Sequence, residues 1–243
     1  MLYVATPVYY GNNPSRINYF KQHVENTKKL LNFEDLNFIF FVEPNSEPML
    51  EIINDNFKKN TTIFKNQFQC GIELNYYNLF HYCFENLKLE NMFFFEDDAI
   101  CSNDSSILIE WASKKELLHT SMLCLLNKHF LFNKNHKIYS NITECDLLKL
   151  EEINYLSAWG CGVGKGFWDK YLKPTWSMMY AFDTNLTNKF TKLPIISPAI
   201  NRLNHIGRTG VHYTESEFMN HGFDFIKIFN SEKKVHDYNL LEF

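Results

Sequence analysis

Short apolar runs alternate with segments of helical periodicity along the first hundred positions of this chain. Short apolar runs predict strands at residues 2–6, 36–42 and 92–95, and a further short strand is predicted at residues 61–64. Apolar residues at helical spacing predict helices at residues 14–31, 48–57 and 71–87. Asn13 or Ser15 can cap the first of these helices, and Pro7 is expected to end the first strand.

This alternation predicts an α/β fold. Strands joined through helices imply right-handed crossovers and a Rossmann-like, mostly parallel central sheet with helices on both faces. The second half is less regular, with a helix expected near residues 105–117, a strand near 121–126, and then aromatic and glycine-rich segments. With 243 residues, 45% of them hydrophobic, the chain can bury one substantial core, so we expect a single domain over residues 1–243.

The fourth predicted strand runs directly into three acids, in the stretch NMFFFEDDAIC at residues 91–101. Ligands of open α/β sheets bind beyond the carboxyl ends of the strands, which places Glu96, Asp97 and Asp98 in that crevice. Because side chains alternate along a strand, Glu96 and Asp98 should lean one way and Asp97 the other. Carboxylates suit Mg²⁺ or Mn²⁺, so one interpretation is a metal site. The other is a solvated acidic turn or a helix cap.

A second segment, SAWGCGVGKGFWDKYL at residues 157–172, has glycine at every second position from 160 to 166. The spacing does not match a dinucleotide-binding GxGxxG motif. It indicates a backbone that comes close to something, followed by a short helix, although a glycine-rich hairpin is an alternative.

A third segment, SPAINRLNHIGRTGVHY at residues 197–213, combines arginines, histidines and glycines. Arg202 and Arg208 could pair with phosphate oxygens while the glycines let backbone amides approach an anion. Each arginine could equally be a solvated surface charge. His205 and His212 could each ligate a metal or simply form hydrogen bonds.

Charge and composition narrow the function classes. The chain has 24 Lys and Arg against 28 Asp and Glu, a formal net charge of −4. A chain with this charge has no overall positive electrostatic field that would attract nucleic acid, which argues against the two-metal polymerases and nucleases. Six scattered cysteines without a CxxC pair indicate reduced thiols. We see no signal peptide and no apolar stretch that could span a bilayer, so we expect a cytoplasmic protein without a transmembrane segment.

Taken in order, these pieces resemble the nucleotide-sugar glycosyltransferases of the GT-A fold. The matching stretches are VATPVYYGNNPSRINYF, GIELNYYNLFHYCFENLKLENMFFFEDDAICS, SAWGCGVGKGFWDKYL and PAINRLNHIGRTGVHY. Within this fold, the EDD triplet and the C-terminal Arg and Gly pattern are similar to inverting N-acetylglucosaminyltransferases. The resemblance implies a nucleotide-sugar-binding half at residues 1–104 and an acceptor-binding half at 105–243.

The resemblance also implies roles for single residues around the donor. Asp98, the third acid of the triplet, would bind the metal, Asp97 would face the ribose or the metal shell, and Glu96 would hold the sugar or a water. Glu43 stands where the family often has an Asp that reads the nucleobase. The further candidates for the nucleotide slot are Thr6, Pro7 and Arg16, with Arg202 and Arg208 for the phosphates.

For the chemistry, the resemblance implies one carboxylate as general base, and Asp183 in MMYAFDTNL is the best positional match. His212 matches a position that ligates metal in some relatives. The expected reaction is transfer of a sugar from a nucleoside diphosphate sugar to an acceptor hydroxyl, dependent on Mn²⁺ or Mg²⁺, with inversion.

The acceptor and the activity itself have alternatives. A glycan is the expected acceptor. The Asn-, Lys-, Phe- and Ile-rich composition suggests the AT-rich genome of a virus or a low-GC bacterium, so a modified base in DNA, as in phage glycosyltransferases, is a second candidate. A non-catalytic nucleotide- or carbohydrate-binding protein on the same scaffold is a third.

Overall fold

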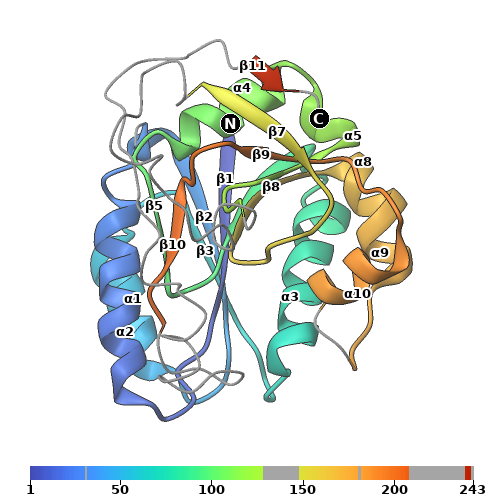
Figure 1. Ribbon diagram of the computed structural model, residues 1–243. Helices are drawn as coiled ribbons and strands as arrows, with labels where there is room; N and C mark the ends of the chain where they lie inside the picture. Colours follow the sequence, from blue (N-terminus) through green and yellow to red (C-terminus); the bar gives the residue numbers. More distant parts are fainter. Residues whose placement is uncertain (31, 128–147, 180–181, 208–238, 242–243) are drawn as a thin grey trace.

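The computed structural model describes residues 1–30, 32–127, 148–179, 182–207 and 239–241 (Figure 1). In the first part of the chain, strands and helices alternate. These elements are β1 (Leu2–Val8), α1 (Pro14–Thr27), η1 (Phe33–Asp35), β2 (Leu36–Val42), α2 (Glu47–Asn56), β3 (Thr61–Lys65), α3 (Gly71–His81), the π-helical turn η2 (Tyr82–Asn86) and β4 (Asn91–Phe95).

The second part has shorter elements. They are β5 (Ala99–Cys101), α4 (Ser105–Lys114), α5 (Leu117–Thr120), β6 (Met122–Cys124), β7 (Lys149–Ile153), β8 (Gly160–Gly164), α8 (Lys165–Phe167), η4 (Trp168–Leu172), α9 (Lys173–Thr175), α10 (Phe182–Lys189), β9 (Ile195–Pro198), β10 (Leu203–His205) and β11 (Asn239–Leu241).

Among the described residues, nine strands form one sheet in the order β11-β7-β9-β6-β8-β4-β1-β2-β3. The pairs from β4 through β1 and β2 to β3 are all parallel, as the alternation predicts. The strand β8 pairs antiparallel with both of its neighbours, β4 and β6. A separate two-stranded ribbon joins β5 and β10. The prediction of a mostly parallel central sheet is confirmed, with β4 in the interior of that sheet.

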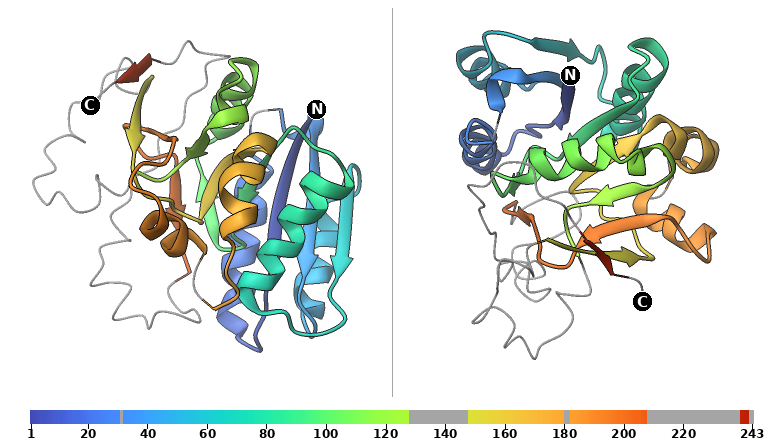
Figure 2. Two further views of the ribbon diagram at one scale, coloured as in Figure 1. Left: turned by 90° about the vertical axis from the view of Figure 1, so that its right-hand side faces the viewer. Right: turned by 90° about the horizontal axis from the view of Figure 1, so that it is seen from above.

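Helices cover both faces of the sheet, as predicted (Figures 1 and 2). One hydrophobic cluster packs α1, α2, α4 and α5 against the face that carries Phe93 and Phe95. The other packs α3, η2, η4 and α10 against the face that carries Met92 and Phe94. Residues 92–95 of β4 are each at most 1% exposed. Because both faces of this strand are buried, its sequence is an uninterrupted apolar run.

Several predicted boundaries shift for local reasons. The first strand continues through Pro7 to Val8, because the ladder between β1 and β4 pairs only Val4 and Ala5 and so requires no N–H from the proline. The first helix ends at Thr27 and is capped by Asn13, whose side chain accepts a hydrogen bond from the Ser15 amide. The helix predicted at residues 105–117 is divided into α4 and α5.

The alternating glycines of β8 serve packing inside the protein. Gly160, Gly162 and Gly164 share one face of the strand, and a Cβ on them would meet Leu203, Ile109 and the Leu118 carbonyl group, respectively. The missing side chains therefore let α4, α5 and β10 lie directly against the strand backbone. The group that approaches the glycine backbone closely is therefore the chain's own helix layer. The alternative of a glycine-rich hairpin is wrong, because β8 lies between β4 and β6 in the sheet.

Replacing Gly164 by Ala is expected to destabilise the fold strongly. The new Cβ would overlap the backbone carbonyl of Leu118, which cannot rotate away, so α5 must shift. Overpacking of this kind costs about 1–3 kcal/mol or more. The matched control is Gly162→Ala, whose Cβ would lie 3.2 Å from a side-chain atom of Ile109 that can adjust. Urea unfolding should rank Gly164→Ala well below Gly162→Ala in stability, and equal losses would contradict this packing account.

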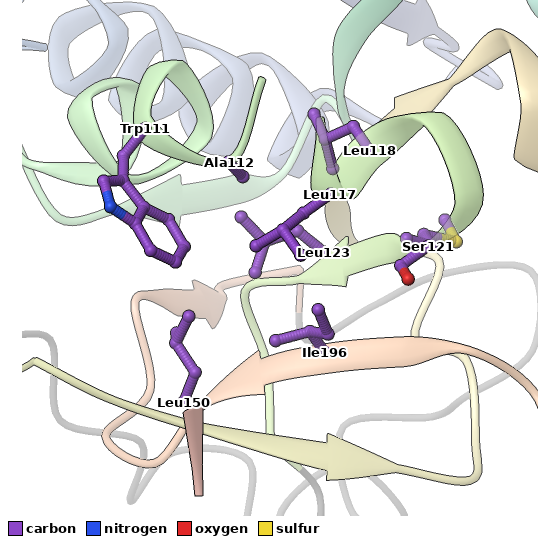
Figure 3. A pocket seen from close by; sticks show the side chains of 9 residues that line it. Trp111, Ala112, Leu117, Leu118, Ser121, Leu123, Leu150 and Ile196 are labelled. Carbon is purple, nitrogen blue, oxygen red and sulfur yellow. The ribbon is translucent and has the colours of Figure 1, made fainter. Parts of the chain in front are cut away.

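The contact between the helices α4 and α5 and the sheet is apolar. Figure 3 shows side chains from α4 and α5 facing side chains of β6, β7 and β9 across a narrow seam, lined by Trp111, Ala112, Leu117, Leu118, Ser121, Met122, Leu123, Leu150 and Ile196. These side chains include no charged group. None of the helices in the described part of the chain has the length and apolar character that crossing a membrane requires.

Candidate functional site

The acidic triplet lies at the carboxyl end of β4, as predicted. Glu96 follows the strand and donates its amide to the Trp159 carbonyl at 3.1 Å, and the Ala99 amide closes a turn onto the Glu96 carbonyl at 3.1 Å. The side chains separate as the alternation along a strand predicts. Asp97 faces α1, whereas Glu96 faces α3 and accepts the Tyr76 hydroxyl at 2.7 Å.

Arg16 of α1 provides the positive charge that the buried acids need. Its guanidinium lies 2.5 Å from Asp97 Oδ1 and 3.7 Å from Asp98 Oδ2. It also donates to the Tyr9 carbonyl at 2.6 Å, while the Tyr9 amide donates to Asp97 at 2.9 Å. Asp97 therefore ties the end of β1 and the start of α1 to the triplet, and its carboxylate is already engaged on both oxygens.

His205 of β10 is the second positive group. Its Nε2 lies 3.1 Å from Asp98 Oδ1 and 3.5 Å from Glu96 Oε2. One potential ligand atom each from Glu96, Asp98 and His205 lies within 4.8 Å of the others, which makes these three a candidate metal centre. The Trp159 ring lies against the imidazole, with ring centroids 4.6 Å apart.

The two cations change how the acids ionise. Burial alone would raise the pKa of Asp98, but His205 and Arg16 hold that pKa below its usual value. Burial lowers the pKa of His205, and the adjacent Asp98 and Glu96 outweigh this and raise it to about 10. Burial raises the pKa of Asp97 to about 6, although Arg16 opposes that shift.

The helix α1 and the ribbon hold the triplet in place. His23 contacts the Ala99 carbonyl at 2.6 Å, and the Asn26 side chain binds both the amide and the carbonyl of Cys101, at 2.8 and 2.9 Å. On the other side, β10 pairs with β5 so that His205 stands opposite Ala99. The antiparallel ribbon thus carries the histidine to the acids.

Three further polar groups gather where α3 meets α10. Glu73 and Tyr76 are one helical turn apart on α3, and Asp183 lies at the start of α10. The Glu73 carboxylate accepts the Phe182 amide at 3.2 Å. Burial, together with the charges of Asp183 and Glu96, raises the pKa of Glu73 to about 7. This places the predicted base, Asp183, within the electrostatic reach of a second carboxylate.

The other residues predicted to contact the nucleotide, at the carboxyl ends of β1 and β2, are buried. Glu43 is 3% exposed and accepts the Cys70 amide at 2.9 Å, so one of its oxygens caps the start of α3. Burial raises its pKa. Thr6 is 1% exposed, and Pro7 is also buried within β1. Their roles toward a nucleotide stay predictions.

Arg202 requires a correction. Its side chain is 1% exposed, lies 3.2 Å from Asp104 Oδ2, and donates to the Ile200 carbonyl at 2.8 Å. The guanidinium is therefore bound within the fold, which disagrees with the predicted phosphate contact. Arg208 and His212 lie outside the described residues.

Glu73 was not predicted from the sequence, and of the two histidines given as possible metal ligands the resemblance favoured His212, which lies outside the described residues. Spacing alone could have suggested Glu73, because it shares a helical face with Tyr76. For His205, the signal is weaker, since its neighbours in the site lie about a hundred positions earlier in the chain.

Comparisons with known proteins were made on sequence and on structure. No protein-family model and no curated protein matches the chain. A crystal structure of residues 1–349 of TarS from S. aureus with UDP-GlcNAc superimposes with a TM-score of 0.59 and 12% identity, covering 87% of this chain and 60% of that one. The present chain thus spans three fifths of this TarS fragment of residues 1–349.

Two other solved structures share the architecture. A mannosyltransferase, PcManGT from Pyrobaculum calidifontis with GDP-Man and Mn²⁺, gives a TM-score of 0.52 at 8% identity, covering 82% of this chain and 56% of that one. The galactosyltransferase LgtC with donor and acceptor sugar analogues gives 0.51 at 9%, covering 81% and 73%. The chain therefore has the fold of these nucleotide-sugar glycosyltransferases, in agreement with the GT-A resemblance.

Proposed function

We propose that this protein is a metal-dependent glycosyltransferase that moves a sugar from a nucleoside diphosphate sugar to an acceptor hydroxyl, with inversion. The observation that carries the proposal is the cluster of Glu96, Asp98 and His205 at the carboxyl end of β4. It lies where α/β sheets bind ligands, in a fold shared with proteins solved with UDP-GlcNAc and GDP-Man.

The three side chains fit a divalent cation. Two carboxylates and one imidazole suit Mn²⁺, and with water or phosphate oxygens they also suit Mg²⁺. Glu96 and Asp98 each have an oxygen near His205 Nε2, so an ion that replaces the imidazole proton would find all three donor atoms close by. When bound, such an ion stabilises the negative charge of the departing diphosphate as a Lewis acid.

The chain's own residues would bind and orient the substrates. Arg16 and Asp97 fix the segment after β1, so that Tyr9 lies beside the acidic triplet, where the donor is proposed to bind. Thr6 and Pro7, near the end of β1, and Glu43, directly after β2, are proposed to shape the nucleotide slot. Arg208 and His212 are proposed as further donor and metal contacts.

Asp183 is the proposed general base. It would accept the proton of the acceptor hydroxyl while that oxygen attacks the anomeric carbon and the bond from this carbon to the diphosphate oxygen breaks. One such displacement inverts the configuration and releases the nucleoside diphosphate. A positioned carboxylate accelerates this proton transfer by about 10²–10⁴-fold. The proposed acceptor is a glycan hydroxyl.

A thermal-shift panel tests the proposal. UDP-GlcNAc, GDP-Man and UDP would each be added with and without Mn²⁺, and UMP would serve as the control. A donor at about 100 times its Kd adds about 2.7 kcal/mol of stability, which is about 5–10 °C in Tm for a chain of this size. We expect this rise only when Mn²⁺ is present together with a matching nucleotide sugar or its nucleoside diphosphate, and no rise with UMP. Equal rises with and without Mn²⁺ would contradict the metal-dependent site.

A further inference from the structure

Glu73 joins α3 to the segment that leads into α10. Its carboxylate accepts the Phe182 amide at 3.2 Å, and its backbone carbonyl accepts the Trp176 indole N–H at 3.1 Å. One residue of α3 therefore contacts both Trp176 and Phe182, the second of which directly precedes Asp183.

Aromatic packing surrounds these two contacts of Glu73. The rings of Trp176 and Phe182 are stacked, with centroids 4.5 Å apart and planes 11° from parallel. The Phe182 ring also packs against the Tyr76 ring, with centroids 5.8 Å apart. The Tyr76 hydroxyl in turn donates a hydrogen bond to Glu96. The start of α10 is thus linked through α3 to the acidic triplet.

The chemistry of Glu73 is unusual for a simple helix cap. The Phe182 amide is one of the N-terminal donors of α10 that need a partner, and a neutral Asn or Ser side chain could satisfy such a donor. Glu73 instead brings a partly buried carboxylate close to the charges of Asp183 and Glu96, where like charges repel. A carboxylate in this place costs stability that a neutral cap would not cost.

We propose that Glu73 is a positioning residue, whose hydrogen bond to the Phe182 amide sets the location of Asp183 relative to the donor site. This role rests on the proposed function, in which Asp183 is the base. A catalytic group displaced by about 1 Å can lose about 10²-fold in rate. Since Phe182 is the residue immediately before Asp183, movement of its amide would move the base directly.

The experiment compares Glu73→Ala, which removes the acceptor oxygen, with Glu73→Gln, whose amide oxygen can still accept from Phe182. The rate measured is release of UDP from UDP-GlcNAc, or of GDP from GDP-Man, by water with Mn²⁺ present. We expect kcat to fall by about 10–100-fold in Glu73→Ala, with little change in KM. In Glu73→Gln, most of the rate should return. The matched control is Asn185→Ala, which removes the bond from Asn185 to the Thr175 carbonyl and loosens α10 elsewhere.

A second readout needs no activity. Amide hydrogen exchange of the peptide covering residues 182–189 should be faster in Glu73→Ala than in Glu73→Gln. Unchanged exchange, or a Glu73→Ala rate equal to that of the Asn185→Ala control, would overturn the positioning role. If the wild-type protein released neither UDP nor GDP, the proposed function would fail and the catalytic role of Glu73 with it, while faster exchange would still establish the contact itself.

Discussion

Replacing Asp98 by Asn is expected to abolish the Mn²⁺-dependent rise in Tm that a nucleotide sugar produces. Asp98 is 5% exposed and lies between His205 and Arg16, so its charge holds the candidate metal centre together. The substitution keeps the size of the side chain but removes the anion. If metal-dependent donor affinity falls by about 100-fold, the stabilisation drops from about 2.7 to about 0.4 kcal/mol, which is about 1 °C.

A second variant and a control make this test specific. A Cβ on Gly207 would overlap the Asp98 carboxylate and displace it. The substitution Gly207→Ala should therefore also reduce the Mn²⁺-dependent rise in Tm. Asp169→Asn removes a charge of the same kind from a half-exposed ion pair with Lys165 and should leave the increment intact. A full Mn²⁺-dependent rise in Asp98→Asn would remove Asp98 from the proposed site.

Replacing Asp183 by Asn is expected to leave donor binding nearly intact while turnover falls by about 10²–10⁴-fold. The asparagine side chain cannot accept the proton of the hydroxyl, although its carbonyl oxygen can still receive the Thr184 amide that Asp183 Oδ1 now accepts at 2.7 Å. The measurement is release of nucleoside diphosphate, combined with the Tm rise from the same donor and Mn²⁺.

The combination of readouts separates catalysis from folding and binding. The control Glu152→Gln alters an exposed carboxylate of β7 that pairs with Lys192 and should retain the full rate. Turnover of Asp183→Asn at the wild-type level would mean that another carboxylate acts as base. Glu73, whose pKa the charge of Asp183 helps to raise, would then be a candidate.

The first half of the fold was predictable because its signals are local. The strands β1, β2 and β4 are short apolar runs, each connecting helix has its own periodicity, and Leu36–Val42 has the predicted bounds. The position of the acidic triplet follows from the same reasoning, since Glu96 directly continues a buried strand. Alternation along that strand then correctly separated Asp97 from Glu96.

The remainder depends on pairings between distant segments. Nothing near Gly162 indicates that its strand enters the sheet antiparallel, opposite Phe93. Arg202 looked like a phosphate ligand because its partner, Asp104, lies 98 positions earlier in the chain. An arginine in a glycine-rich loop has the same local sequence whether it binds an anion or a buried aspartate, and only the tertiary structure distinguishes the two.

The small ribbon of β5 and β10 has a thermodynamic consequence for the whole molecule. It brings His205 from late in the chain to acids that follow β4, through three paired positions. An ion held by Glu96, Asp98 and His205 would therefore cross-link the two halves of the polypeptide. Occupancy by substrate and ion would strengthen the attachment of the later half to the earlier one by linkage, so that the loaded protein should resist proteolysis across this junction better than the empty one.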